Sequence, residues 1–378
     1  MPELMKNKYY NYASLHALAL SIKGVYPSFQ VDDFVGDIMD ETWNALELKA
    51  RMRKITVNLG KHLPPDYKQA LGIIDKVIAG FPAGLYDNAL IYFPDFVEVY
   101  GQDECNWDLS IAAIERYTPC STAEFAVRPF IINNEERMMS QMAIWARHDN
   151  EHLRRLASEG CRPALPWGQA LTSFKKDPSP VLAILEQLKA DTSLYVRKSV
   201  ANNLNDISKT HPNLIAKIAR DWYGKNKYTN WIVKHGCRTL LKAGNRDVLN
   251  IFGFVDVDCV NIKNFMLSTA VIAIGEALTF SFEVLGTETT KVRLEYGIDY
   301  VKANGKRSRK IFQISEIFLK ENQEKSYTKT HSFANLSSRV HYPGNHSITL
   351  IVNGSERGTL NFELTADEIV RINTLNRK

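Results

Sequence analysis

The sequence predicts a mainly α-helical protein, an α-solenoid of stacked helix pairs, that ends in a smaller all-β sandwich. Apolar residues recur at helical spacing up to about residue 254, whereas apolar and polar residues alternate with period two after about residue 255. A faint repeat within the helical part is the third observation. Because 378 residues exceed what one hydrophobic core usually supports, we expect two domains, over residues 1–254 and 255–378.

Short breakers divide the helical part. Residues 41–63, for example, place six apolar side chains at mixed three- and four-residue spacing with charges between them, a pattern typical of an amphipathic helix. Pro and Gly end such stretches because they interrupt helical hydrogen bonding or favour turns. The predicted breaks are HLPPD at 62–66, GFPAG at 80–84, RPALPWG at 162–168, KDPSP at 176–180 and THP at 210–212.

Three helical segments resemble one another. HLRRLASEG at 152, YVRKSVANN at 195 and WIVKHGCRT at 231 each begin with an aromatic residue or His, followed by an aliphatic and then basic residues. Their starts are 43 and 36 residues apart, a period that fits stacked helix pairs of the HEAT kind. Such a solenoid builds a concave surface from one helix of every pair.

The segment SVANNLNDISK at 199–209 combines two stripes at helical spacing. Packing in the stack would use the apolar stripe, and the polar stripe would then face the concave surface. The apolar stripe is Val196, Val200, Leu204 and Ile207, and the polar stripe is Ser199, Asn202, Asp206 and Lys209.

The β pattern is clearest in GEALTFSFEVL, TTKVRLEYGIDYV, RKIFQISEIFL and HSITLIVNGSERGTLNFEL. Seven or so short strands in this length predict an antiparallel sandwich of immunoglobulin type. Because none of the five cysteines lies after Cys259, and none forms a CxxC pair, we expect neither an inter-sheet disulfide nor a zinc ribbon. The final TADEIVRINTLNRK is predicted to be a short helical or frayed tail.

Composition and charge limit the class of protein. The chain has no apolar run of about 18 residues and no signal-peptide pattern, so we expect a cytoplasmic protein with no membrane partner. Residues 128–250 hold 20 Lys and Arg against 11 Asp and Glu, a net charge of +9, whereas the whole chain carries only +5. A basic middle segment indicates either a polyanionic partner, nucleic acid first, or simply a charged soluble surface.

One literal motif suggests a metal. His148-Asp149-Asn150-Glu151-His152 matches HxxEH, in which two His one helical turn apart can bind zinc. The alternative is a polar turn between two helices. No P-loop, dinucleotide-binding glycine motif or GxSxG occurs, which disfavours nucleotide hydrolysis, dinucleotide redox chemistry and a hydrolase elbow.

Four other residues are candidates for chemistry, each with a structural alternative. Asp206 could pair with neighbouring lysines on a helix surface. Glu159 lies near a helix C-terminus, where a carboxylate opposes the helix dipole. Trp167 lies on a Pro-bounded loop, where its indole could cover the core or present a face to a base or sugar. Glu124 could be the acid of a capping box that begins at Ser121.

At these residues the sequence resembles the AlkC-type DNA glycosylases, which are relatives of the AlkD HEAT-repeat glycosylases. The resemblance rests on STAEFAVRPFI (121–131), IWARHDNEHLRRLASEGCRPALPWG (144–168) and RKSVANNLNDISKTHP (197–212). It implies a right-handed HEAT-like solenoid, and family members with an immunoglobulin-like domain would account for the C-terminal part.

The resemblance also implies an activity. Such a protein is a monofunctional, monomeric enzyme of the bacterial cytosol that hydrolyses the N-glycosidic bond of cationic bases, mainly N3-methyladenine and N3-methylcytosine, in double-stranded DNA without base flipping. It needs no metal and no organic cofactor. The catalytic residues of the family fall on Glu124, Glu159, Trp167 and Asp206.

Physical chemistry is consistent with these roles. A cationic base is already a good leaving group, and carboxylates beside the sugar stabilise the oxocarbenium-like charge that its departure leaves. An indole face attracts the same charge. The basic loop KANGKRSRK at 302–310 is either a further DNA contact or a solvated hairpin. The residues expected to bind DNA are Arg154, Arg155, Arg162, Arg197, Lys198, Asn202, Lys234 and Arg238.

Two further hypotheses remain. A non-catalytic HEAT scaffold could bind DNA or protein through the same basic surface, and it would release no base. A metallopeptidase at His148 and His152 would require stoichiometric zinc.

Overall fold

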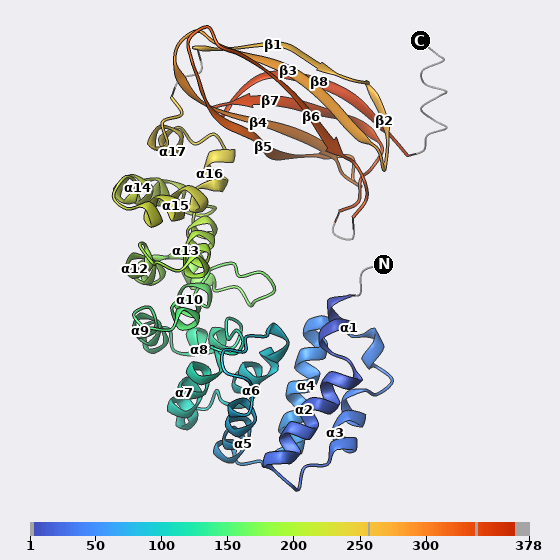
Figure 1. Ribbon diagram of the computed structural model, residues 1–378, viewed down its shortest axis with the longest axis vertical. Coiled ribbons are helices and arrows are strands. Elements are labelled where there is room, and N and C mark those ends of the chain that lie inside the picture. The colour runs from blue at the N-terminus through green and yellow to red at the C-terminus, as the bar shows by residue number, and fades with distance from the viewer. Residues whose placement is uncertain (1–3, 256–257, 337–338, 367–378) are drawn as a thin grey trace. The chain divides into compact units, whose positions relative to one another are not determined.

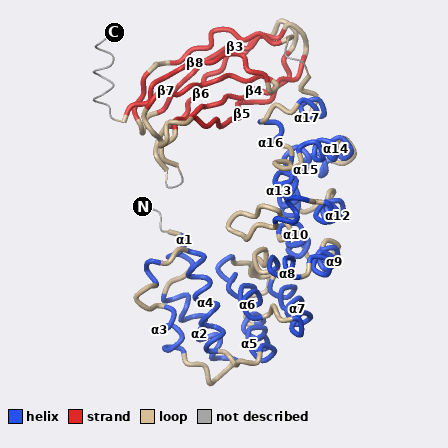
Figure 2. Tube along the Cα trace, turned by 180° about the vertical axis from the view of Figure 1, so that it is seen from behind, coloured by secondary structure: helices blue, strands red, loops and turns tan. Residues whose placement is uncertain are grey.

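The computed structural model describes residues 4–255, 258–336 and 339–366 (Figure 1). Helices occupy the chain as far as residue 251 and strands follow from residue 260, as the colours of Figure 2 show. The predicted order of a helical part followed by an all-β part is therefore confirmed. The predicted limit at residue 254 falls between the last helix and the first strand, and as a boundary between two domains it stays a prediction.

Contacts divide the chain into two compact units. The first unit is Met1–His211 with Gly224–Gly236, and the second is Pro212–Tyr223 with Cys237–Lys378. The helices of the first unit are α1 Met5–Tyr9, α2 Tyr12–Val25, α3 Val31–Ile38, α4 Leu48–His62, α5 Tyr67–Ala79, α6 Tyr92–Tyr100, α7 Trp107–Tyr117, α8 Val127–Asn133, α9 Glu135–Trp145, α10 Glu151–Glu159, α11 Thr172–Lys176, α12 Ser179–Leu188, α13 Leu194–Ile207 and α15 Lys227–Gly236.

Segment 41–63 is not helical throughout. A short 3₁₀ turn, Trp43–Ala45, precedes α4, and Leu46 and Glu47 between them are extended. The Asp40 carboxylate accepts hydrogen bonds from the backbone N–H and the hydroxyl of Thr42, which fixes a turn where the apolar spacing alone indicates a helix.

Successive helix pairs of the first unit stack on one another. In Figure 1, α9 and α12 lie in one column and α10 and α13 in the other, and each pair packs against the next. The three resembling segments of the sequence form α10, α13 and α15, which contact one another in that order. The predicted internal repeat is therefore confirmed.

Small and polar residues let these helices approach closely. The hydroxyls of Ser158 and Ser199 are 2.5 Å apart between α10 and α13, and Asn203 donates to the carbonyl of Ser158. A Cβ on Gly236 of α15 would lie 3.0 Å from the Cβ of Leu204, so a larger residue would push α15 away from α13. The apolar stripe of α13 is buried, as predicted. The polar stripe faces outward only in part, because Ser199 is buried against α10 and Asp206 is buried beside Arg162, whereas Asn202 is partly exposed and Lys209 is exposed.

The second unit joins three helices to the strands. Its helices are α14 Pro212–Trp222, α16 Arg238–Lys242 and α17 Arg246–Ile251, and its strands are β1 Val260–Leu267, β2 Val271–Ala273, β3 Ala277–Gly286, β4 Thr290–Val301, β5 Arg307–Leu319, β6 Glu324–Ser332, β7 Gly344–Val352 and β8 Ser355–Thr365. One sheet has the order β1-β3-β6 and the other β2-β8-β7-β4-β5. Every pairing between these strands is antiparallel except β2 with β8, which is parallel and differs from the predicted all-antiparallel sandwich.

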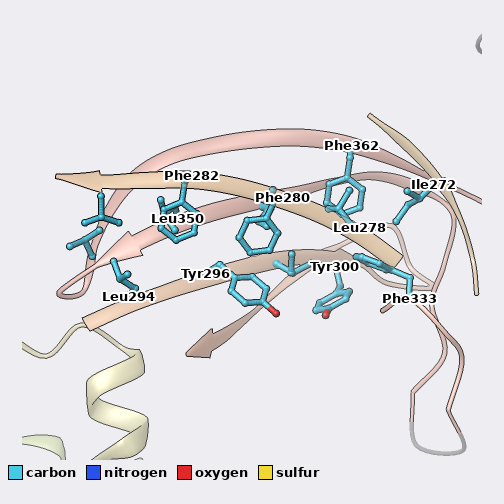
Figure 3. Close-up of a cluster of buried hydrophobic side chains, with 14 of the residues drawn as sticks. Ile272, Leu278, Phe280, Phe282, Leu294, Tyr296, Tyr300, Phe333, Leu350 and Phe362 are labelled. Carbon is cyan, nitrogen blue, oxygen red and sulfur yellow. The ribbon is translucent and has the colours of Figure 1, made fainter. Parts of the chain in front are cut away.

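The inward faces of both sheets form one apolar core, part of which Figure 3 draws. Phe280 and Phe282 of β3 face Tyr296 of β4 and Leu350 of β7 across this core. Alternate residues of each strand point to opposite faces, so the period-two pattern of the sequence supplies these side chains. All five cysteines are free thiols, and hydrophobic packing takes the place of an inter-sheet disulfide.

Two further predictions concern the C-terminal tail and membrane-spanning helices. Of the predicted tail at 365–378, Thr365 ends β8 and residues 367–378 lie outside the described residues. Among the helices that the structure describes, none is both long and apolar enough to cross a membrane.

His331 gives the sandwich a pH dependence. Its two ring nitrogens bond to the hydroxyls of Tyr296 and Tyr300, and burial, assisted by Arg339, lowers its pKa to about 4. An unfolded His has a pKa near 6.5, so the unfolded chain binds the proton first. We expect the free energy of unfolding to fall by about 3 kcal/mol as the pH drops from 6.5 to 4.

Urea denaturation followed at several pH values measures this dependence. Burial also lowers the pKa of His341 and His346, which contribute in the same direction. His331→Gln removes the largest contribution and should flatten the slope between pH 6.5 and 4. An unchanged slope in that variant would show that another group titrates.

Candidate functional site

The three carboxylates predicted to be catalytic are joined by cations into one line. We name Glu124, Arg155, Glu159, Arg162, Asp206 and Lys209 the charge line. Arg155 Nη2 lies 2.5 Å from Glu124 Oε2 and 3.7 Å from Glu159 Oε1. Arg162 Nη1 lies 2.6 Å from Glu159 Oε1, and its Nε and Nη2 each lie 2.8 Å from Asp206 Oδ2. Lys209 Nζ ends the line, 3.0 Å from Asp206 Oδ1.

Local structure sets each member of the line. Asn150 caps α10 by accepting from the N–H of His152, and the helix then presents Arg155 and Glu159 on one face, four residues apart. Arg162 follows the end of α10 and reaches Asp206 on α13. The line therefore depends on the stacking of α10 against α13.

The interior of the line is withdrawn from solvent. The side chains of Asp206, Glu159 and Glu124 are 4%, 8% and 15% exposed. Burial opposes the charge of Arg155, but Glu124 and Glu159 outweigh it and raise the pKa of that guanidinium. Burial likewise opposes the charge of Arg162, and Glu159 and Asp206 together raise its pKa. Both arginines therefore stay charged, as a buried carboxylate requires of its partner.

The indole of Trp167 projects into the solvent. Its side chain is 73% exposed, and its φ of 63° is a left-handed conformation that non-glycine residues seldom adopt. The Lys49 ammonium donates to its carbonyl at 2.8 Å. We conclude that the loop conformation directs the indole to the surface.

Arg128 holds the ends of the same loop. Its guanidinium donates to the carbonyls of Gly160, Arg162 and Gln169 at 2.9, 3.0 and 2.5 Å. This side chain is fully buried, and burial lowers its pKa to about 10. A single buried guanidinium thus fixes both the residues that follow Glu159 and those that follow Trp167.

A cavity of about 350 Å³ adjoins Glu124, Arg155 and Trp167, and we name it the aromatic cavity. The hydroxyls of Tyr86 and Tyr195 are 3.0 Å apart in its wall. The sequence singled out Tyr195 only as the first residue of a repeat segment and did not single out Tyr86, and no motif links the two because they are distant in the chain.

The residues predicted to bind DNA differ in their contacts within the protein and in their exposure. Arg154 is paired with Asp191, and Arg197 donates to the carbonyls of Asp191 and Thr192 and lies over the ring of Tyr228. Lys198 on α13 is exposed. Asn202, Lys234 and Arg238 are partly exposed. Arg155 and Arg162 bind carboxylates of the charge line, a role that the i,i+3 and i,i+4 spacings around Glu159 could have indicated.

The basic loop at 302–310 forms a turn with mixed contacts. Lys302 and Lys306 close it by a backbone hydrogen bond, and Arg307 donates to the carbonyl of Asn345. Arg309 pairs with Asp299. Both the DNA-contact and the solvated-hairpin interpretations are compatible with this geometry.

Two alternative interpretations from the sequence can be compared with the structure. The HxxEH residues span the turn before α10 and its first two residues. His148 Nδ1 accepts from the N–H of the capping Asn150, and His152 in the helix stacks on Tyr86. No group of three or more possible metal-ligating side chains occurs in the described part of the chain. The capping-box interpretation of Glu124 is wrong, because α8 begins at Val127 and Glu124 bonds to Thr122 and Arg155 instead.

Comparison with known proteins agrees with this combination of fold and site. Residues 120–240 match the family described as DNA alkylation repair enzyme, and residues 261–366 match the C-terminal Ig-like domain of uncharacterised protein YhaZ. The chain is 47% identical to the uncharacterized protein YhaZ of Bacillus subtilis, over 94% of this chain and 98% of that one. It is 35% identical to the alkylpurine DNA glycosylase AlkC of Pseudomonas fluorescens, solved bound to DNA containing an abasic site analog, with a TM-score of 0.91 over 96% of this chain and 100% of that one.

Fold and site together therefore define a helical-repeat DNA alkylation repair protein with an immunoglobulin-like C-terminal domain. Since the similarity to the solved glycosylase extends over nearly the whole of both chains, this protein belongs to the AlkC-type DNA glycosylases, and the resemblance found in the sequence is confirmed.

Removal of Arg162 tests the charge line. Arg162→Met leaves Glu159 and Asp206 buried without their shared partner, so we expect the free energy of unfolding to fall by about 3–5 kcal/mol. Urea denaturation at neutral pH measures the loss. As a matched control, Arg220→Met breaks a pair with Asp247 in which both side chains are more than 60% exposed, and it should cost less than about 1 kcal/mol. Equal losses in the two variants would contradict the structural role of the line.

Proposed function

We propose that this enzyme hydrolyses the N-glycosidic bond of cationic alkylated bases, mainly N3-methyladenine and N3-methylcytosine, in double-stranded DNA. The observation that carries the proposal is the convergence of three carboxylates and an exposed tryptophan in the charge line and its adjoining loop. The DNA with an abasic site analog bound by the Pseudomonas fluorescens relative supports the same substrate class. The enzyme acts as a monomer in the cytoplasm and needs no base flipping.

The reaction follows from the charge of the substrate. The electron pair of the C1′–N bond returns to the cationic ring, which leaves as a neutral methylated base, and positive charge develops on the deoxyribose. Water adds to C1′ and gives its proton to the solvent. Carboxylates fixed beside the sugar stabilise the developing charge without reorganising, and the indole of Trp167 offers its face to the same charge.

Asp206 requires a step before it can act. Both of its oxygens are bonded, Oδ2 to Arg162 and Oδ1 to Lys209. The Lys209 side chain is 52% exposed, so a DNA phosphate can replace Asp206 as the partner of its ammonium group. Departure of Lys209 frees Oδ1 to face the sugar, whereas Arg162 keeps the carboxylate in place.

Phosphate binding is assigned to lysines whose side chains are exposed or partly exposed. Lys198 is exposed on α13, one turn before the partly exposed Asn202. Lys234 of α15 is partly exposed. Each such contact releases counterions from the DNA, which makes the affinity depend steeply on salt.

The base-release assay tests the proposal directly. Asp206→Asn removes the negative charge without changing the shape of the side chain, so we expect release of N3-methyladenine from methylated DNA to slow by about 100-fold or more. Asp191→Asn is the matched control, since Asp191 is equally buried and paired with Arg154 but lies outside the charge line. Undiminished release by Asp206→Asn would refute its role, and no release by the wild type would favour the non-catalytic scaffold.

Salt titration tests the phosphate contacts. Lys198→Ala should weaken DNA binding uniformly across sequences and reduce the slope of log affinity against log salt by about 1. Lys76→Ala is the control, since Lys76 is also exposed but lies on α5. Fluorescence anisotropy with labelled duplex DNA at several salt concentrations gives both slopes, and equal slopes would place the phosphates elsewhere.

A further inference from the structure

Glu124 and Trp167, which act in the proposed reaction, also line the aromatic cavity, but that reaction assigns no occupant to the cavity itself. Its residues all belong to the first unit. A volume near the lower end of the range for small-molecule pockets, roughly 300–1,000 Å³, suits a ligand of one heterocycle. Six of its lining residues are aromatic, namely Tyr9, Tyr10, Tyr86, Phe125, Trp167 and Tyr195.

Two of the aromatic residues in the lining, Tyr86 and Tyr195, are held in place by contacts within the protein. Tyr86 stacks on His152 with 4.6 Å between ring centroids, and its hydroxyl bonds to that of Tyr195. The guanidinium of Arg155 lies 5.1 Å from the centre of the Tyr195 ring. Rings held in this way lose little conformational entropy when a planar ligand packs against them.

One edge of the cavity offers a hydrogen-bond acceptor. Glu124 uses Oε2 for both Thr122 and Arg155, and Oε1 has no hydrogen-bond partner among the residues that the structure describes. Asn88 adds a side-chain amide to the lining. A carboxylate oxygen accepts well from an exocyclic amino group, whereas it repels a phosphate. This combination fits an amino-substituted heterocycle.

Three residues of the lining are charged. Its charged members are Lys49, Glu124 and Arg155, which together carry +1. The ammonium of Lys49 lies 4.6 Å from the centre of the Phe125 ring and so occupies that face already. A neutral planar base meets aromatic walls and an acceptor here.

We propose that the aromatic cavity binds the neutral methylated base after cleavage, with its amino group toward Glu124 Oε1. This proposal rests on the proposed function, since that reaction turns a cationic base into a neutral one. The cavity holds the released base beside the charge line, and the enzyme is therefore inhibited by its own product.

Binding of the free base tests this site without any DNA. Isothermal titration of the full-length protein with N3-methyladenine should show one saturable site. Tyr195→Leu should weaken binding of the neutral base about tenfold or more, by loss of a stacking surface. Tyr228→Leu is the matched control, because Tyr228 packs beside Arg197 and does not line the cavity.

A second measurement keeps the test independent of how a variant folds. Free N3-methyladenine added to the wild-type enzyme should inhibit base release, with an inhibition constant equal to the dissociation constant from titration. Base release without saturable binding of the free base, or equal binding by Tyr195→Leu and the wild type, would overturn the cavity proposal and leave the glycosylase standing. Failure of base release by the wild-type enzyme would instead overturn the proposed function.

Discussion

The site depends on one electrostatic constraint, which is that three carboxylates buried between helices need cations among them. Arg155 and Arg162 each lie between two of these carboxylates. An unpaired buried carboxylate would take up a proton and lose the charge that the proposed chemistry needs. The arginines therefore preserve the charge, and because their planar guanidinium groups bind at fixed angles, they also fix the positions of the carboxylates.

Helix packing determines which charges can meet. Arg162 follows α10 and Asp206 lies on α13, so their bond depends on the close approach of these two helices, which the small residues Ser158 and Ser199 allow. The repeat thus has two functions in the same place. It builds the hydrophobic stack, and it brings residues about 40 positions apart in the chain into one ion-paired line.

Glu124 connects the charge line to the aromatic cavity. One of its oxygens holds Arg155, and the other is directed to no described partner. In the proposed reaction the sugar gains positive charge while the base loses it. The charged sugar and the neutral base therefore need different surroundings. Carboxylates suit the first, and flat aromatic walls suit the planar second product.

The sequence by itself determined the order of helices and strands and the repeat, because periodicity reports local geometry. Its resemblance to a known family supplied the family and the catalytic assignment of Glu124, Glu159, Trp167 and Asp206. The sequence misplaced the start of α4, where Asp40 and Thr42 form a turn that spacing does not reveal. Only the tertiary structure decided that Arg155 and Arg162 bind carboxylates, that Ser199 packs between helices, and that Tyr86 and Tyr195 meet in a cavity wall. Those contacts join residues that are distant in the chain, and their partners follow from how helices stack, which no local pattern specifies.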